Sequence, residues 1–201
     1  MDSFIAQLTA TSFLEGVAVI LALAYVWLAA LQNVWCWPCA LVSTALYTWL
    51  FWSVSLPFHT LLNIYFMLMA VYGWLKWTGS KEQSITVKTL PIFYHLLFIS
   101  GLSLAAIGLS YYASSIFDSS YLYLDAFITV FSVFTTFLVT HKVRENWLYW
   151  IVINIFGVYL YFSKGMSLTG VLYLFYVGFA VYGYLKWRGD SAINSDNIAA
   201  T

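Results

Sequence analysis

Ala70-Val71-Tyr72-Gly73-Trp74-Leu75-Lys76-Trp77 returns 110 residues later as Ala180-Val181-Tyr182-Gly183-Tyr184-Leu185-Lys186-Trp187, with seven of the eight positions identical. The same offset, without a gap, pairs residues far outside this stretch: Glu15 with Asp125, Leu28 with Leu138, Trp37 with Trp147, and Ser53 with Ser163. Similarity at a fixed offset indicates that a chain is built from copies of one structural unit. The sequence therefore predicts two copies of a unit that ends near Trp77 and Trp187.

The composition of the 201-residue chain is that of a membrane protein. It is 63% apolar, 21% aromatic and only 8% charged, with a mean hydropathy of +0.84. A soluble domain carries about 25% charged residues, so this chain lacks the polar surface that water requires. Its apolar runs of about 20 residues have the length of a helix that spans the bilayer core. The alternation typical of an outer-membrane barrel is missing. We expect an all-α integral membrane protein in a lipid bilayer, with no nucleic-acid partner.

Apolar runs and helix breakers predict seven transmembrane helices, at about 11–31, 35–53, 58–77, 90–112, 120–141, 146–163 and 167–187. Helices 1–3 and 5–7 are then the two copies. Because three helices change the side of the membrane, the single helix between the copies restores the starting side, and the copies run parallel. This 3+1+3 parallel repeat is the arrangement of the SWEET proteins. The predicted divisions are a first repeat at 1–88, a linker helix at 89–114, a second repeat at 115–190 and a cytoplasmic tail at 191–201, expected to be disordered.

The loop charges predict the orientation. With seven spans, one side of the membrane receives seven of the eight basic residues: Lys76, Lys81, Lys88, Lys142, Arg144, Lys186 and Arg188. The other side receives Lys164 alone. By the positive-inside rule, the N-terminus is outside and the C-terminus is in the cytoplasm. Residues 1–10 contain no Lys or Arg, so the first apolar run is not expected to be a cleaved signal peptide.

The stretch from Glu145 to Asn154 combines aromatic and amide side chains. On a helix, Trp147, Trp150 and Asn154 occupy positions i, i+3 and i+7 and form one stripe. A buried amide without a hydrogen bond costs roughly 2–7 kcal/mol by transfer estimates, so Asn154 needs a partner. That partner is either a ligand in a cavity or a neighbouring helix, with Trp147 then acting as an interfacial anchor. The residues alone leave these two interpretations open.

Asn146-Trp147-Leu148-Tyr149-Trp150-Ile151-Val152-Ile153-Asn154 resembles the N-W-L-x-W-x-x-x-N signature of the PnuC family of bacterial vitamin transporters. Tyr72-Gly73-Trp74 with Trp77 is similar to the family's Y-G-W-x-x-W, and Asp125 falls where the family has an Asp at the start of helix 5. The resemblance covers about residues 10–190.

The resemblance implies a 3+1+3 homotrimer in the bacterial inner membrane, with one vitamin bound between the repeats of each subunit. Transport is then facilitated diffusion by alternating access, followed by trapping through cytoplasmic phosphorylation. Trp147, Trp150 and Asn154 carry over as substrate-binding residues. The resemblance implies no enzymatic activity, no cofactor and no metal site.

Two departures from the family concern the substrate. Asn63 stands where the nicotinamide riboside branch has a Gln, and Ala70-Val71 stands where that branch has Asn-Ile. These changes favour thiamine as the substrate, with nicotinamide riboside as the alternative. Both vitamins contain a flat cationic ring, which the face of a Trp attracts, and a hydroxylated arm. The amides of Asn63 and Asn154 can donate to and accept from such groups.

Three further residues are candidates for the substrate path. Glu15 and Asp125, at equivalent outer ends of helices 1 and 5, could attract a cation, or they could only stabilise the helix N-termini. Tyr173, the repeat mate of Asn63, is a candidate lining residue. The predicted helices carry no Asp, Glu, Lys or Arg at mid-membrane, whereas an ion-coupled carrier would require such residues there. No Gly-Lys-Ser loop is present to bind a nucleotide. We therefore expect a uniporter.

Three rival functions come from other classes. Cys36-Trp37-Pro38-Cys39 has the C-x-x-C spacing of a membrane thiol oxidoreductase, although the predicted orientation places it in the reducing cytoplasm. A haem or quinone protein would need facing pairs of His at mid-membrane, and His59, His95 and His141 do not suggest such pairs. A scaffold or receptor subunit without transport remains the third rival.

Overall fold

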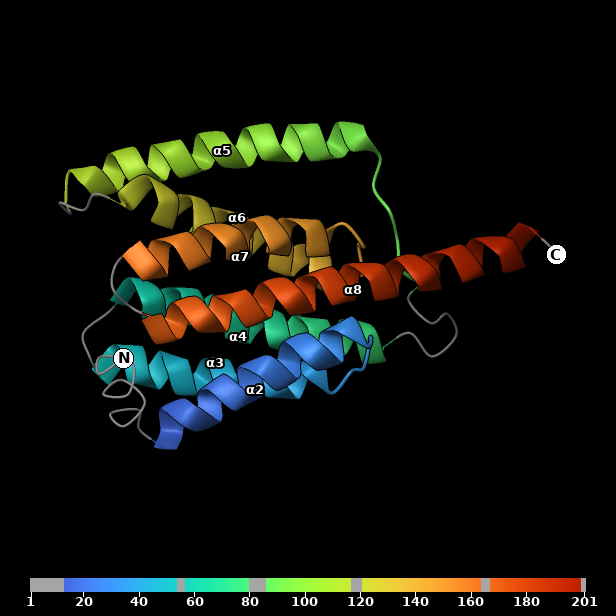
Figure 1. The fold of residues 1–201 in the computed structure, drawn as a ribbon, viewed down its shortest axis with the longest axis horizontal. Coiled ribbons are helices and arrows are strands. Elements are labelled where there is room, and N and C mark those ends of the chain that lie inside the picture. Colours follow the sequence, from blue (N-terminus) through green and yellow to red (C-terminus); the bar gives the residue numbers. More distant parts are fainter. Residues whose placement is uncertain (1–12, 54–56, 80–85, 117–120, 164–166, 200–201) are drawn as a thin grey trace.

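The computed structural model describes residues 13–53, 57–79, 86–116, 121–163 and 167–199. This part of the chain folds into seven helices, as predicted (Figure 1). In chain order these are α2 (Phe13–Ala30), α3 (Cys36–Ser53), α4 (Pro57–Thr78), α5 (Ile92–Ser114), α6 (Leu122–Thr140), α7 (Asn146–Ser163) and α8 (Ser167–Ala199).

The helix ends follow the 110-residue offset of the sequence. Equivalent ends are Ala30 and Thr140, Cys36 and Asn146, Ser53 and Ser163, and Pro57 and Ser167. The turns after the first helix of each unit also agree, because Gln32 and Lys142 have positive φ angles of 54° and 52°. A residue other than Gly adopts this backbone conformation only rarely. Two such residues at equivalent positions indicate that the turn has the same geometry in both units.

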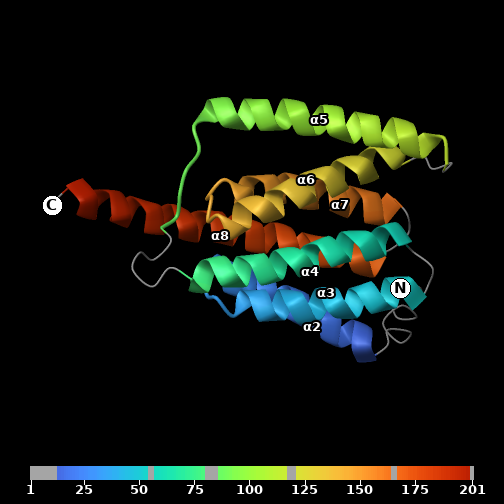
Figure 2. The same cartoon turned by 180° about the vertical axis from the view of Figure 1, so that it is seen from behind.

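The six helices of the two units form a closed ring. Within each unit the middle helix packs against both others, so α3 contacts α2 and α4, and α7 contacts α6 and α8. The units meet where α2 packs against α8 and where α4 packs against α6. Among the described residues, helices on opposite sides of the ring do not pack together. α5 lies outside the ring against α6, as both views show (Figures 1 and 2).

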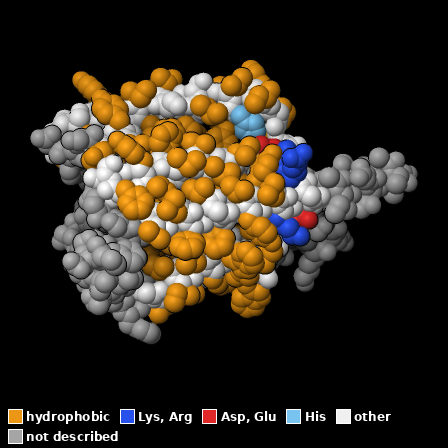
Figure 3. Space-filling view, in the orientation of Figure 1, with side chains coloured by type: hydrophobic (Ala, Val, Ile, Leu, Met, Phe, Trp, Pro, Cys, Tyr) orange, Lys and Arg blue, Asp and Glu red, His pale blue; other side chains and the backbone are white. Residues whose placement is uncertain are grey.

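The surface of this bundle is apolar around its middle and charged at one end. Figure 3 shows hydrophobic side chains over most of the visible face and Lys and Arg side chains near the end where α8 leaves the bundle. In the described part of the chain, α5 and α6 are long and apolar enough to cross a membrane by length and composition. Most of α5 is exposed. We call the end with Lys76, Lys142, Arg144, Lys186 and Arg188 the basic end.

The linker helix α5 is fixed to the second unit at the basic end. The Lys88 N–H donates to the Lys142 carbonyl at 2.9 Å, and the Arg144 N–H donates to the Lys88 carbonyl at 2.8 Å. Farther along, His95 of α5 hydrogen-bonds through Nδ1 to the Tyr149 hydroxyl of α7 at 2.9 Å. α5 therefore belongs structurally with α6 and α7.

The expectation that the chain is disordered beyond Gly189 is wrong for most of that segment. α8 continues through this region to Ala199. The sequence from Ser191 to Ala199 contains neither Pro nor Gly, so nothing in it stops a helix that has already been formed. Polarity alone indicates that a segment leaves the membrane, and it does not indicate that the helix ends there.

Candidate functional site

The predicted stripe of α7 faces the inside of the ring. The opposite face is exposed and apolar, and consists of Leu148, Val152, Ile155, Phe156, Tyr159 and Phe162. Trp150 packs against both buried clusters of the molecule, one at the basic end and one between α5, α6 and α7. Asn154 is only 5% exposed, no hydrogen bond from its side chain to another described residue is seen, and its amide atoms are not among the fully shielded ones. A buried amide of this kind indicates a position where a ligand could bind.

The Trp147 side chain is packed tightly on both sides, more so than an aromatic ring that only stacks against a ligand needs to be. Its side chain is 3% exposed, and its indole lies directly against the backbone of Gly183. The ring of Trp187 meets it edge-on, with centroids 5.5 Å apart. Its buried Nε1 donor has no acceptor in the described structure. Trp147 therefore packs α7 against α8 and leaves a buried indole donor without an acceptor in the described structure.

The first unit repeats this arrangement. Trp37 lies against Gly73, and Trp77 meets it edge-on at 5.2 Å. The buried Nε1 of Trp37 is also without an acceptor in the described structure. The conserved spacing of Trp, Gly and Trp in both repeats thus reflects one packing device used twice.

The second Trp of each device fastens the two units to each other. Trp77 Nε1 donates to the Thr140 carbonyl at 3.1 Å, and Trp187 Nε1 donates to the Ala30 carbonyl at 3.1 Å. These carbonyls belong to the last turns of α6 and α2, where helix carbonyls lack partners within the helix. The two Trp rings lie 6.4 Å apart. The ring of helices is therefore closed at its basic end by aromatic side chains from both units.

Tyrosine side chains surround the other part of the interior. The ring of Tyr173 lies directly against Gly157 of α7, with Tyr161 4.9 Å and Tyr176 5.7 Å away between centroids. Asp125, in the first turn of α6, interacts electrostatically with Tyr161 and Tyr173. The structure thus brings the predicted Asp125 and Tyr173 together. Sequence reasoning missed Tyr161 and Tyr176, whose signal was their helical spacing from Asn154 and Tyr173.

The other predicted residues are placed as follows. Asn63 is half-buried on the same face of α4 as Ala70 and Trp77. The side chain of Glu15, in the first turn of α2, lies outside the described residues. Ala70 is buried in the cluster at the basic end, as is its repeat mate Ala180.

Val71, which belongs to the Ala70-Val71 departure from the nicotinamide riboside branch, lies away from the inner face of α4. Its side chain is 43% exposed and lines an outer groove between α3 and α4, next to Pro38 and Leu75. The helical period explains this, because Val71 is one residue, about 100°, away from the inner stripe of Ala70 and Trp77. A difference at this position therefore says nothing about the substrate.

The structure shows how most of the Cys and His residues that suggested the rival functions are packed and bonded. Cys36 is fully buried, and both Cys36 and Cys39 are free thiols. His95 is bonded to Tyr149, and His141 Nδ1 lies 2.9 Å from the Phe137 carbonyl. The side chain of His59 lies outside the described residues. In the described part of the chain, no three His, Cys, Asp or Glu side chains group as metal ligands would.

Comparison with known proteins agrees with this geometry. The family model described as nicotinamide mononucleotide transporter matches residues 12–189. The chain is 23% identical to the nicotinamide riboside transporter PnuC of Escherichia coli K12, over 91% of this chain and 90% of that protein. It is 23% identical to the riboflavin/roseoflavin transporter RibM of Streptomyces davaonensis, over 78% of this chain and 75% of that protein.

A solved structure shares the fold. The crystal structure of the vitamin B3 transporter PnuC superimposes with a TM-score of 0.73 over 94% of this chain and 86% of that one, at 22% identity. The predicted SWEET-like arrangement of helices is thereby confirmed.

Proposed function

Because this chain belongs to the nicotinamide mononucleotide transporter family, and is thus a multi-pass membrane transporter and not an enzyme, we propose that it carries nicotinamide riboside. Transport proceeds by facilitated diffusion with alternating access, and cytoplasmic phosphorylation then traps the vitamin. The observation that carries this proposal is Asn154, a buried amide without a described partner on the inner face of the ring. The nicotinamide ring is a flat cation, and Trp150 beside Asn154 offers it an aromatic face.

The charges of the described residues favour an unphosphorylated substrate. Lys and Arg lie at the basic end and in α8 beyond it, and none of the described ones lies between the two ends of the ring. A phosphate group inside the path would have no cationic partner, and charge-assisted bonds to Arg or Lys are the usual means of holding one. Nicotinamide riboside meets this condition, and its mononucleotide does not.

Thiamine is the second candidate, and its support is now reduced. Two departures favoured thiamine, the Ala70-Val71 pair and Asn63. Within the pair, Val71 faces outward and Ala70 packs in the core, so only Asn63 still supports thiamine. The relatives compared above are named for nicotinamide riboside and for riboflavin. The weight of support therefore moves from thiamine to nicotinamide riboside.

The orientation and mechanism follow from the charges. By the positive-inside rule, the basic end is cytoplasmic and the N-terminus is outside. Glu15 and Asp125 lie in the first turns of α2 and α6, and Asp190 lies in the part of α8 that extends beyond the ring. Such a distribution supports uniport, since ion-coupled carriers place acids within the membrane. The trimer implied by the family resemblance stays a prediction.

Calorimetric titration of the purified protein in detergent tests this function. We expect nicotinamide riboside to bind, with thiamine and nicotinamide mononucleotide each binding at least about tenfold more weakly, a difference of ~1.4 kcal/mol. Tighter binding of thiamine would restore Asn63 as the residue that decides specificity. Tighter binding of the mononucleotide would contradict the charge argument. Absence of binding by all three compounds would overturn the proposed substrate class.

A further inference from the structure

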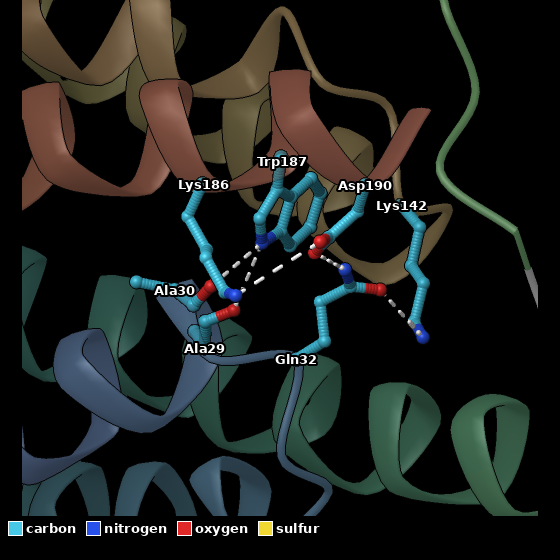
Figure 4. A network of polar contacts seen from close by, with 7 residues as sticks. All are labelled: Ala29, Ala30, Gln32, Lys142, Lys186, Trp187 and Asp190. Atoms are coloured by element: carbon cyan, nitrogen blue, oxygen red, sulfur yellow. Dashed lines mark hydrogen bonds and ion pairs between the residues drawn. The ribbon is translucent and has the colours of Figure 1, made fainter. Parts of the chain in front are cut away.

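A chain of polar contacts crosses the basic end and joins the two units (Figure 4). Lys142 Nζ donates to Gln32 Oε1 at 3.2 Å, and Gln32 Nε2 donates to Asp190 Oδ2 at 2.6 Å. Gln32 and Lys142 are repeat mates, and each occupies the left-handed position that follows the first helix of its unit. The contacts thus connect the turn after α2, the turn after α6 and the cytoplasmic extension of α8.

The same residues cover the aromatic closure of the ring. Lys142 Nζ lies 4.6 Å from the centroid of Trp77, whose ring faces Trp187 of the opposite unit. A cation in this position is attracted by the aromatic face. The basic end is therefore closed by two layers, with the Trp pair inside and the polar chain outside.

We propose that Gln32, Lys142 and Asp190 form a latch that holds the basic end closed, and that its release opens the path to the cytoplasm. The inference rests on the proposed transport function. Transport by two repeats requires them to move against each other around a binding site. The latch is a polar link across that boundary at the basic end, in addition to the indole hydrogen bonds of Trp77 and Trp187, and it lies beyond the Trp pair. Separation of the units there must break it.

The strength of the latch suits a device that opens and closes. Its bonds are partly buried, which makes them stronger than exposed ones, yet they remain near water. Burial lowers the pKa of the Lys142 ammonium, while the charge of Asp190 acts in the opposite direction. The Lys142 ammonium is thus partly desolvated, and the nearby carboxylate favours its charged form. Water can replace these partners when the units separate, so opening does not leave a buried charge alone.

The chain contains its own reporter of opening. Cys36 is fully buried at the basic end, in the cluster that contains Ala29, Ala30 and Trp187. A thiol reagent reaches Cys36 only when the closure opens. Replacement of Cys39 by Ala leaves Cys36 as the single thiol of the chain. The rate of maleimide labelling then measures opening in the absence of substrate. In detergent, the reagent has access to both ends of the protein.

Asp190→Ala in this background removes the acceptor at the end of the latch. We expect Cys36 to be labelled about tenfold faster, as expected from the loss of one hydrogen bond to a charged group. Lys142→Ala should have a similar effect. Lys186→Ala is the matched control, because Lys186 pairs with Asp190 within α8 at 4.0 Å and does not cross between the units. Its labelling rate should stay within about twofold of the parent, as for an exposed pair.

Global unfolding is separated from opening by the melting temperature. Labelling is compared well below the melting temperature of every variant, and Lys142→Ala replaces Asp190→Ala if the latter unfolds early. Unchanged labelling in both variants would overturn the latch, as would equal acceleration by Lys186→Ala. Because no substrate is needed, this result is independent of the calorimetry. Binding of nicotinamide riboside with unchanged labelling would reject the latch alone.

Discussion

Replacement of Asn154 by Leu will weaken the binding of nicotinamide riboside while leaving the ligand-free protein as stable as before, or more stable. Asn154 is only 5% exposed, yet its amide atoms are not among the fully buried polar atoms that lack a partner in the described structure, so they stay accessible in the empty protein. An apolar side chain of similar size removes the bond to the ligand and adds buried apolar surface. We expect the dissociation constant to rise by about 10- to 100-fold, or ~1.4–2.8 kcal/mol. Calorimetry and thermal unfolding measure the two effects separately.

Thr44→Val provides the matched control in the first unit. Thr44 is the repeat mate of Asn154, but its hydroxyl donates to the Ala40 carbonyl of its own helix at 2.7 Å. Its hydroxyl is thereby occupied, and we expect the affinity to change by less than about threefold, within the range of a weak local bond. A drop in the melting temperature of Asn154→Leu, with binding retained, would show that the amide serves helix packing instead.

Gly183→Ala will destabilise the protein, because a Cβ at this position would lie 2.6 Å from Cε2 of the Trp147 indole. The neighbouring atoms belong to a buried ring that packs against Trp187, so the indole cannot move aside easily. Overpacking of this kind costs about 1–3 kcal/mol. For a chain of this size we expect the melting temperature to fall by roughly 2–4 °C per kcal/mol, measured by thermal unfolding in detergent.

Gly178→Ala controls for the general effect of Ala in the same helix. A Cβ at Gly178 meets nothing within 4 Å, so only helix propensity acts there. That term favours Ala by up to about 1 kcal/mol. The two substitutions in α8 should therefore shift stability in opposite directions. Equal stability of Gly183→Ala and Gly178→Ala would mean that the Trp147 wedge contributes little to packing.

Much of the fold could be predicted because the sequence contains the same three-helix unit twice. The offset that joins Gly73 to Gly183 and Trp77 to Trp187 also sets the helix ends, so the seven helices and their grouping followed from sequence alone. The features of the fold that could be predicted were those whose sequence pattern is present in both copies. The extension of α8 was missed because its counterpart in the first copy, α4, ends at Thr78, and because the sequence from Ser191 to Ala199 carries no helix breaker.

The interior could be predicted only in part. Trp147, Trp150 and Asn154 were identified as one face, yet the spacing did not reveal that Trp147 is fixed against Gly183. Packing of this kind depends on which residue the opposite helix presents, and helical period does not determine that. Gln32 and Lys142 were missed for another reason. The offset pairs them, but they share neither charge nor shape, so the sequence does not indicate the backbone angle that both adopt.

The two repeats also differ in a way that decides how a ligand can lie. Tyr47 and Asn63 in the first unit correspond to Gly157 and Tyr173 in the second, so the large and the small side chain exchange helices. Likewise Trp150 and Asn154 correspond to Ala40 and Thr44. A ring with perfect twofold symmetry would accept the same molecule equally well in two orientations, related by half a turn. Here the positions equivalent to Trp150 and Asn154 carry neither an aromatic ring nor an amide in the first unit. A vitamin with a distinct head and arm can therefore enter this ring in one preferred direction, and duplication followed by divergence gives a symmetric frame an asymmetric interior.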